Sequence, residues 1–286
     1  MIWVDGRVVP DDALKVSALD RTFEHGLGLF ETFRTWNGLA PLLDRHMARL
    51  TRSARELGLP VDSVALPDAV AVAALRQAEQ VEDDVVLRVT LTGGVSETGG
   101  ATLWMRTLPL PPAFRRDGAV VAAGHWRLVR NDPLARHKTL NYWSRRQAFE
   151  TAQRLGFDEA LSMTLGWCVW EGSRTNLFVV QGDTLSTPST NGPIVPGVMR
   201  GLVLERARDL LFHDVREVDG LREPTLEAAD EVFLTNSVRG VVPVEKIFPD
   251  ETVKRLRNRT WPAPGPWTQR LSLHVNDWLQ RGGDPP

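Results

Sequence analysis

The stretch EGSRTNLFVV (Glu171–Val180) says more about the fold of this chain than any other segment. It begins with an acid, continues through a cluster of Ser, Arg, Thr and Asn, and ends in a wholly apolar strand pattern. A carboxylate held beside such a strand can pair with the protonated ring nitrogen of a bound cofactor. The same letters also describe a polar loop that enters a strand, so the residues alone leave both interpretations open.

Length and composition narrow the class of protein around this stretch. The chain has 286 residues, of which 42% are hydrophobic, and this is enough for two domains of ordinary size. The formal net charge of -2 combines 34 basic and 36 acidic residues, which favours neither nucleic acid nor an anionic membrane as a partner. A single cysteine, Cys168, excludes an intrachain disulfide and a cysteine-based metal cage.

Targeting signals are not expected in this sequence. The first residues, MIWVDGRVVPDD, lack the basic and apolar pattern of a signal peptide. No stretch approaches the ~20 consecutive apolar residues that a membrane helix needs. We therefore expect a cytoplasmic globular protein.

The periodicity of apolar residues predicts an α+β fold, because strands and helices alternate only loosely in both halves. The elements expected are a hairpin over 2–9, strands over 29–36, 85–94 and 103–108, helices over 43–57 and 67–80, a strand near Val120, a helix over about 142–155, short strands around Ala160, Val169 and Phe178, a helix that begins at Gly197, a strand over 231–235 and a helix over 267–279. Alternation places Phe30, Thr32 and Arg34 on one strand face, and Arg88 on the face opposite Leu87.

Lys138 is the first candidate for covalent chemistry. It lies in ARHKTLNYW, between His137 and Thr139 and just before a predicted helix. Nearby cations lower the pKa of an amine, and a neutral amine is the form that attacks an aldehyde. An ordinary surface lysine is the simpler interpretation of these residues when they are taken alone.

Three further positions could bind a phosphate. Gly197 begins the predicted helix in VPGVMRGL, and free backbone N–H groups at a helix start bind anions, although many helices begin after Pro-Gly. Arg49 could reach a phosphate with two N–H groups, or cover the edge of the core. Ser237, at a strand end, could donate to a phosphate oxygen or cap a turn. His25 and His46 lack metal-ligand spacing, so we expect structural roles and no metal site.

The order of these motifs is more specific than any one of them. The blocks LDRHMARL, HKTLN, EGSRTNLF, PGVMRG and FLTNSVRGVVPV follow one another with the separations of the class IV aminotransferase family, and the chain resembles that family from about Asp5 to Val244. The family covers branched-chain and D-amino-acid aminotransferases, some amine transaminases and aminodeoxychorismate lyase. The resemblance implies pyridoxal 5'-phosphate as cofactor and a homodimer.

The resemblance also implies the fold-type IV architecture of pyridoxal-phosphate enzymes. This architecture has a small α+β N-terminal domain and a larger C-terminal domain around a β-barrel-like core. The segment PLPPAFRRDG (Pro109–Gly118), rich in proline and charge, is typical of a linker. We therefore expect the small domain at residues 1–110, the linker at 111–118 and the larger cofactor-binding domain at 119–286.

Each family role falls on a numbered residue of this chain. Lys138 matches the Schiff-base lysine, and Glu171 matches the acid at the pyridine nitrogen. Tyr142 lies near the tyrosine that branched-chain enzymes place against the cofactor hydroxyl, but it is one residue closer to the lysine. The positions that match phosphate ligands are Arg49, Val198, Met199 and Ser237.

The residues that would select the substrate point in two directions. Thr32 matches the catalytic threonine of aminodeoxychorismate lyase, and GVMR and TNSVRG are similar to that enzyme. However, lyases generally carry lysine where this chain has Arg88, and their arginine-containing loop is GGVSETGG here. Arg88 resembles the substrate-facing arginine of branched-chain enzymes, but His25 and Val86 replace aromatic residues of theirs. The Arg and His pair of the D-amino-acid enzymes is not visible.

Two arginines on the same face would suit a substrate with carboxylates. If Arg34 and Arg88 both face the pocket, their paired N–H donors fit one or two carboxylate groups; alternatively, either arginine is held in a structural ion pair. Both candidate substrate classes carry carboxylates, so charge does not separate them.

We predict an aminotransferase that moves an amino group between small-molecule amino and 2-oxo acids, with Lys138 as the general base. The alternative is aminodeoxychorismate lyase, which releases pyruvate to give 4-aminobenzoate. A further alternative is a cofactor-binding protein without turnover, against which the presence of Lys138 and Glu171 argues.

Overall fold

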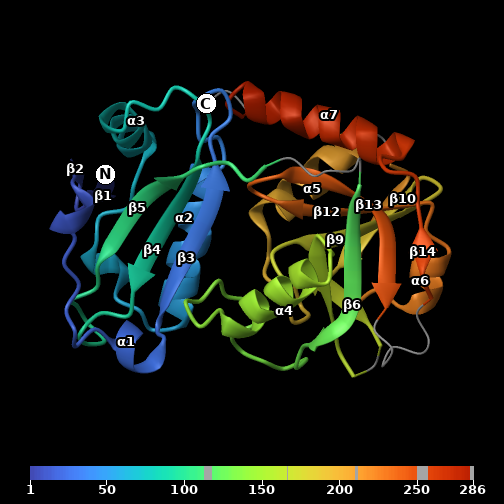
Figure 1. The fold of residues 1–286 in the computed structure, drawn as a ribbon, viewed down its shortest axis with the longest axis horizontal. Coiled ribbons are helices and arrows are strands. Elements are labelled where there is room, and N and C mark those ends of the chain that lie inside the picture. The colour runs from blue at the N-terminus through green and yellow to red at the C-terminus, as the bar shows by residue number, and fades with distance from the viewer. Residues whose placement is uncertain (113–117, 166, 210–211, 250–256, 284–286) are drawn as a thin grey trace. The chain divides into compact units, whose positions relative to one another are not determined.

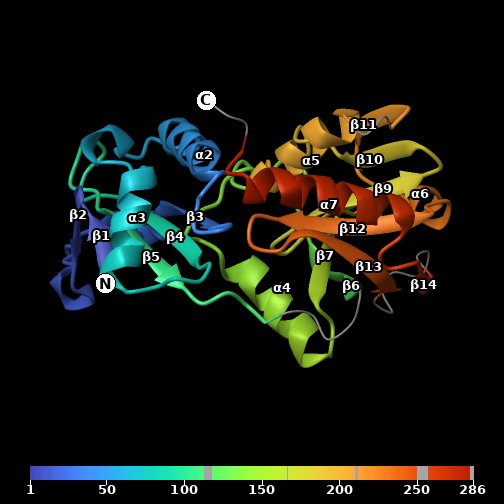
Figure 2. The same cartoon turned by 90° about the horizontal axis from the view of Figure 1, so that it is seen from above.

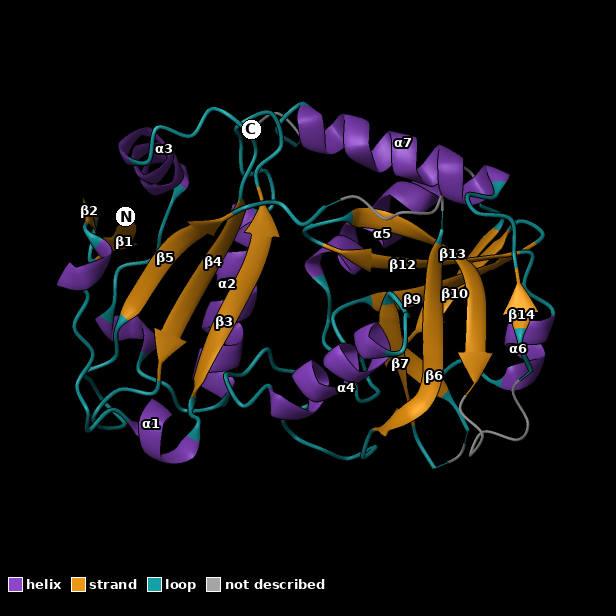
Figure 3. Cartoon of the chain, viewed as in Figure 1, coloured by secondary structure: helices purple, strands orange, loops and turns teal. Residues whose placement is uncertain are grey.

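The computed structural model describes residues 1–112, 118–165, 167–209, 212–249 and 257–283. The chain forms two compact units, whose elements are labelled in Figures 1 and 3. The N-terminal unit contains Met1–Pro111, His137–Asn141 and the chain from Trp278 onward. The barrel unit contains Pro112–Arg136 and Tyr142–Asp277. Most of the predicted linker, residues 113–117, lies outside the described residues, and the predicted domain boundaries stay a prediction.

The N-terminal unit is built on an antiparallel five-stranded sheet in the order β2-β1-β5-β4-β3. Its strands are β1 (Ile2–Val4), β2 (Arg7–Val9), β3 (Gly28–Arg34), β4 (Val86–Thr92) and β5 (Leu103–Leu108). Asp5 and Gly6 both have positive φ, of 49° and 80°, as a two-residue hairpin turn requires. The predicted hairpin and strands are therefore confirmed.

Helices cover one face of this sheet, as Figures 1 and 2 show for α2 (Leu43–Glu56). The buried apolar side chains of α2 recur at steps of four and three and form one stripe, at Leu43, Met47, Leu50 and Ala54. The helix α3 (Ala69–Ala78) packs in the same core, and the Asp68 carboxylate caps it by accepting from the Ala71 N–H. The short helix α1 (Arg21–His25) precedes β3, and one-turn helices are η1 (Asp11–Ala13) and η2 (Val61–Ser63).

The two faces of the sheet differ in chemistry. Phe33 and Leu87 pair across β3 and β4 and are fully buried on the face that the helices cover. On the other face Thr32 pairs with Arg88, and Arg88 pairs with Arg106. Because side chains alternate along a strand, this second face is made by Phe30, Thr32, Arg34, Val86, Arg88, Thr90, Trp104 and Arg106. The alternation predicted from the sequence is confirmed.

A segment distant in sequence pairs with the edge of β3. The Phe30 N–H donates to the Lys138 carbonyl, the Leu140 N–H donates to the Gly28 carbonyl, and both distances are 2.9 Å. Since the bridge is antiparallel, Lys138 lies opposite Phe30 and its side chain projects from the second face. The sequence-based domain 119–286 includes this segment, whereas its hydrogen bonds join it to the N-terminal unit.

The barrel unit is organised around a closed barrel of six strands, in the order β9-β12-β13-β6-β7-β8, with β8 paired back to β9. The strands are β6 (Ala119–Arg127), β7 (Glu159–Met163), β8 (Val169–Gly172), β9 (Asn176–Gln181), β12 (Glu231–Asn236) and β13 (Gly240–Pro249). Apolar side chains such as Val121, Leu161, Leu177 and Leu234 fill its core. The expected β-barrel-like core is confirmed.

Further strands and helices surround the barrel. The additional strands are β10 (Thr184–Pro188), β11 (Asp214–Val218) and β14 (Arg259–Thr260), and the helices are α4 (Trp143–Arg154), α5 (Val198–Asp209), α6 (Glu223–Glu227) and α7 (Pro266–Gln280). The helix α5 packs against β12. The ring of Phe233 on β12 stacks on that of Phe178 on β9, with 4.9 Å between the ring centres. Residues 210–211, which directly follow α5, lie outside the described residues. Within the described ranges, no helix is both long and apolar enough to span a membrane.

Leu87→Ala should destabilise the protein by about 2–5 kcal/mol, because it leaves a cavity in a fully packed core. The matched control is Leu273→Ala on α7, whose side chain is 66% exposed and should cost no more than about 0.5 kcal/mol. Urea unfolding monitored by Trp fluorescence measures both. Equal losses in the two variants would contradict the packing described for the sheet.

Candidate functional site

The turn between β8 and β9 is anchored by the buried carboxylate of Glu159. This carboxylate accepts hydrogen bonds from the Ser173 N–H at 3.1 Å, the Ser173 hydroxyl, the Arg174 N–H at 3.3 Å and the Thr175 hydroxyl at 3.1 Å. A Cβ at Gly172 would lie 2.0 Å from the Thr175 hydroxyl oxygen, so only glycine fits there. The polar residues of EGSRTN therefore hold the buried carboxylate of Glu159 and shape the turn.

A second buried acid, Glu171, begins the same turn and is 2% exposed. Its Oε1 accepts from the Arg145 guanidinium at 2.5 Å, and this pair is buried. Its Oε2 accepts from the Val195 N–H at 3.1 Å and from the Asn176 side-chain amide at 3.5 Å. Donors from three separate segments thus hold one carboxylate, which can accept a proton-bearing group of a ligand.

Asn176 connects this acid to the start of α5. Its amide nitrogen also donates to the Val195 carbonyl at 3.0 Å. A Cβ on Gly197 would lie 1.9 Å from the Asn176 Oδ1, so the glycine lets the chain before α5 approach the amide. The carboxylate and the helix start are consequently fixed to each other within the barrel unit.

The start of α5 carries groups that suit an anion. Val198 and Met199 form its first turn, where backbone N–H groups have no partner inside the helix. Ser237 directly follows β12, the strand against which α5 packs. The Thr235 hydroxyl on β12 is buried and has no hydrogen-bond partner among the residues that the structure describes. Hydroxyl and amide donors of this kind fit the oxygens of a phosphate.

Tyr142 precedes α4 and donates its hydroxyl to the Ser173 carbonyl at 2.9 Å. Burial raises the pKa of Tyr142 to about 12, with Arg145 opposing and Glu171 adding to the shift. The phenol therefore remains protonated at neutral pH and serves as a donor. The sequence predicts contact with a cofactor hydroxyl, and in this structure the hydroxyl holds the EGSRTN turn.

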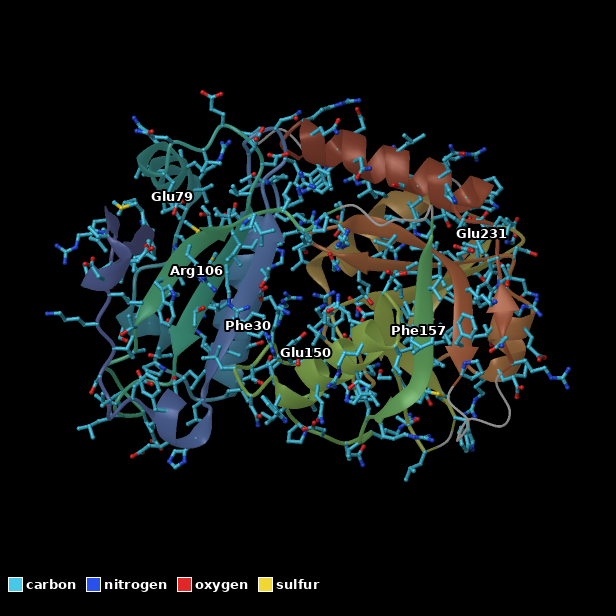
Figure 4. All side chains as sticks on the ribbon, viewed as in Figure 1. Phe30, Glu79, Arg106, Glu150, Phe157 and Glu231 are labelled. Carbon is cyan, nitrogen blue, oxygen red and sulfur yellow. The ribbon has the colours of Figure 1, made fainter. Side chains whose placement is uncertain are left out.

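On the second face of the N-terminal sheet, Lys138 Nζ lies 4.2 Å from the centre of the Phe30 ring. The Arg88 guanidinium lies 4.0 Å from the same ring centre. Thr32 is the strand partner of Arg88, and Figure 4 labels Phe30 on β3. Two predicted site residues, Lys138 and Arg88, therefore lie over one aromatic side chain. Thr32 lies on the same sheet face, opposite Arg88.

Arg34 lies on the same face but is engaged in a structural ion pair, the alternative that the sequence left open. It donates to the Asp84 carboxylate at 3.0 Å and to the Thr35 carbonyl at 2.9 Å. Burial alone would raise the pKa of Asp84, but hydrogen bonds from Gly38, Thr35 and Arg34 outweigh it and lower that pKa. Because Asp84 holds its guanidinium, Arg34 is not among the residues that we propose to bind the substrate.

Arg49 grips a buried carboxylate instead of projecting freely from α2. Its Nε donates to Glu31 Oε1 at 2.8 Å, and a terminal nitrogen donates to Oε2 at 2.5 Å. His46 donates from Nδ1 to the same Oε2 at 2.7 Å and stacks on Phe33. Burial lowers the pKa of His46 and outweighs the attraction of Glu31, so the imidazole is neutral at pH 7. The structural role expected for His46 matches this contact.

Glu159 and Arg145 are the site residues that sequence reasoning missed. Glu159 follows Asp158 and begins the strand β7, and it belongs to none of the sequence motifs discussed above. Arg145 lies seven residues after Lys138, and its helical spacing with Ala148 and Ala152 places it on the buried stripe of α4. A charge on an apolar helix stripe was a readable signal, because such charges are rarely buried without a partner.

Comparison with known proteins assigns the chain to a family. The family model described as "Amino-transferase class IV" matches residues 28–247. The chain belongs to the class IV aminotransferases, whose members are pyridoxal-phosphate-dependent enzymes. The predicted family and the fold-type IV architecture are thereby confirmed.

Individual relatives include both activities considered above. A protein of Methanocaldococcus jannaschii, provisionally named a branched-chain-amino-acid aminotransferase, is 30% identical over 256 residues, which are 86% of this chain and 87% of that protein. The crystal structure of a branched-chain aminotransferase from Thermoproteus uzoniensis is 27% identical, with a TM-score of 0.82 and coverage of 98% and 95%. That of 4-amino-4-deoxychorismate lyase from Pseudomonas aeruginosa is 31% identical, with a TM-score of 0.76 and coverage of 98% and 100%.

Glu31→Gln should remove a pH-dependent component of stability. Burial would raise the pKa of Glu31, but Arg49 and His46 outweigh it and lower the pKa to about 2. The ionised carboxylate therefore stabilises the fold above its unfolded pKa of 4.5, and this stabilisation is lost as the pH falls from 4.5 towards 2. At pH 7 the variant should lose about 3–5 kcal/mol, because Arg49 is left as a buried charge without its partner.

Urea unfolding at pH 7 and pH 3 tests this, with Asp62→Asn as control. Asp62 pairs with Arg55 at 2.8 Å, but both side chains are exposed, so little change is expected. A variant at Glu31 that keeps the wild-type pH dependence would show that the buried pair does not stabilise the fold.

Gly197→Ala and Gly201→Ala should change stability in opposite directions. The first places a methyl group against Asn176, and overpacking of this kind costs about 1–3 kcal/mol. The second lies inside α5 with no atom within 4 Å of its Cβ, so alanine should stabilise the helix by up to about 1 kcal/mol. Thermal unfolding of the two variants decides, and a Gly197→Ala protein as stable as wild type would contradict the close approach.

Proposed function

We propose that this chain is an aminotransferase that moves an amino group between an amino acid and a 2-oxo acid, with pyridoxal 5'-phosphate as its cofactor. The observation that carries the proposal is the position of Lys138 and Arg88 over the Phe30 ring, on the sheet face that also carries Thr32. An amine, a carboxylate-binding guanidinium and a hydroxyl are the groups that amino-acid chemistry needs. Membership of the class IV family supports the same conclusion.

The donor set of the barrel unit fits this cofactor. The first-turn amides of Val198 and Met199 and the Ser237 hydroxyl would hold its phosphate, and the unpartnered Thr235 hydroxyl fits the same anion. Arg49 would bind the phosphate as its family position implies, while Glu31 holds the other side of its guanidinium. Glu171 would pair with the ring nitrogen, and Tyr142 would lie near the cofactor hydroxyl.

When bound, the cofactor supplies an aldehyde that takes up an amine and a ring that accepts an electron pair from carbon. Lys138 Nζ would hold the aldehyde until an amino acid replaces it. The same nitrogen would then take the proton from the substrate carbon that bears the amine. It would return that proton to the cofactor carbon that had carried the aldehyde. Glu171, as an ionised carboxylate, would hold a proton on the ring nitrogen.

Arg88 is the residue that we assign to the substrate carboxylate. Its guanidinium lies over the same ring as the Lys138 amine, so an acid bound by Arg88 would present its amine-bearing carbon close to Lys138. Amino and oxo acids both carry this carboxylate, and one arginine can therefore serve both halves of the reaction.

One observation favours the second candidate, aminodeoxychorismate lyase. Thr32 is the strand partner of Arg88, on the face from which Lys138 projects. A hydroxyl there could move a proton during release of pyruvate. A homodimer, a cytoplasmic location and the absence of nucleic-acid or membrane partners stay predictions.

A split assay on cofactor-loaded protein distinguishes the two activities. One half receives L- and D-amino acids with 2-oxoglutarate, and glutamate is measured. The other half receives aminodeoxychorismate, and 4-aminobenzoate and pyruvate are measured. We expect glutamate, with Lys138→Ala at least about 100-fold slower because it loses the proton-transfer group. Arg88→Gln should raise KM for the amino acid. Arg7 on β2 is exposed, so Arg7→Gln should change neither KM nor kcat.

Other outcomes lead to other functions. Aminobenzoate with pyruvate would make the chain a lyase, and loss of that activity in Thr32→Val would identify its proton donor. A protein that binds the cofactor and gives neither product would be a binding protein, and would overturn the proposal.

A further inference from the structure

Arg145 is a buried charge to which the family roles carried over above assign nothing. It lies on the buried stripe of α4 with Ala148 and Ala152, positions where a helix normally carries apolar side chains. The residue is 8% exposed. Taking a guanidinium out of water is costly unless an opposite charge and hydrogen bonds replace the lost solvation. Its presence on this stripe therefore requires a specific partner.

That partner is Glu171. An Arg145 terminal nitrogen donates to Glu171 Oε1 at 2.5 Å, and to the Ala135 carbonyl at 3.4 Å. The guanidinium also lies 5.0 Å from the centre of the Trp126 ring. Burial alone would lower the pKa of Arg145, but the attraction of Glu171 outweighs it and raises that pKa, so the guanidinium keeps its charge. A permanent cation thus stands against the carboxylate.

Both oxygens of Glu171 are oriented by protein donors. Arg145 holds Oε1, while the Val195 N–H and the Asn176 amide hold Oε2. The last two donors orient the group but are neutral, so Arg145 supplies the opposite charge in this set. A carboxylate beside a fixed cation in a buried place stays ionised.

We propose that Arg145 is a positioning residue, which holds Glu171 ionised and in one orientation towards the ring nitrogen of the cofactor. The inference rests on the proposed function, because it assigns the ligand of Glu171. The alternative is a purely structural role. In that case the Arg145–Glu171 pair would attach α4 to the barrel, and its loss would leave cofactor binding unchanged. The two possibilities differ in what Arg145→Gln does to the affinity for pyridoxal phosphate.

The experiment is a double-mutant cycle with Arg145→Gln, Glu171→Gln and the double variant. Equilibrium dialysis gives the dissociation constant of pyridoxal phosphate, its visible absorption band reports the state of the ring, and thermal unfolding of the cofactor-free proteins reports stability. Arg145→Gln should weaken cofactor binding roughly ten- to a hundred-fold, as loss of a charged supporting partner commonly does. It should add little to Glu171→Gln, because its effect passes through that carboxylate.

Neighbouring residues provide matched controls. Arg146→Gln removes the next arginine of α4, which is 69% exposed and pairs with Glu150, labelled in Figure 4; its affinity should equal that of wild type. Arg145→Lys keeps the charge without the planar fork and should bind the cofactor with intermediate affinity. If Arg145→Gln does not fold, the lysine variant still carries the comparison.

Three results would overturn the inference. Wild-type affinity and absorption in Arg145→Gln would leave the pair with a structural role only. An equal loss in the presence and absence of Glu171 would show that Arg145 acts by another route. A wild-type protein that does not bind pyridoxal phosphate would overturn the proposed function as well, so the two failures are distinguishable.

Discussion

The carboxylate of Glu159 is the group on which the architecture of the candidate site depends. Four donors from Ser173, Arg174 and Thr175 converge on it and bend the chain from β8 into β9. That turn closes the barrel, because Glu171 and Asn176 are the residue pair that joins the two strands. The carboxylate of Glu159 on β7 thus takes up the donors of this turn, and Glu171 is held by donors from other segments.

Buried pairs of a carboxylate and an arginine recur in both units. Glu31 with Arg49 ties β3 to α2, and Glu171 with Arg145 ties β8 to α4. Such pairs add little net stability over apolar packing, since both charges must leave water. Each pair instead fixes the orientation of a group that the proposed chemistry uses, Arg49 in the first pair and Glu171 in the second. The exposed pairs of the same helices, Arg55 with Asp62 and Arg146 with Glu150, have no such constraint.

Local periodicity explains why so many elements were predictable. Alternation in β3 and β4 and the three-four spacing of α2 depend on neighbours in sequence, and these patterns gave the faces on which Thr32 and Arg88 lie. Contacts between residues distant in sequence could not be predicted from the sequence. The pairing of Lys138 with Phe30, the ion pair of Arg34 with Asp84, and the convergence of the EGSRTN turn on Glu159 each join residues that no local pattern connects. Family resemblance supplied the roles that we propose for Lys138 and Glu171, but not the residues that hold them in place.

The attachment of His137–Asn141 to β3 has a consequence for how the chain can vary. Backbone pairing admits only whole-residue steps, and each step turns every side chain to the opposite side. His137 and Thr139 already point the other way, with His137 bonded to Ser53 of α2 at 3.0 Å. One residue gained or lost within this short stretch would exchange Lys138 with a neighbour and turn the amine to the side on which His137 contacts α2. The register of these five residues against β3 is therefore as restrictive as the identity of the lysine itself.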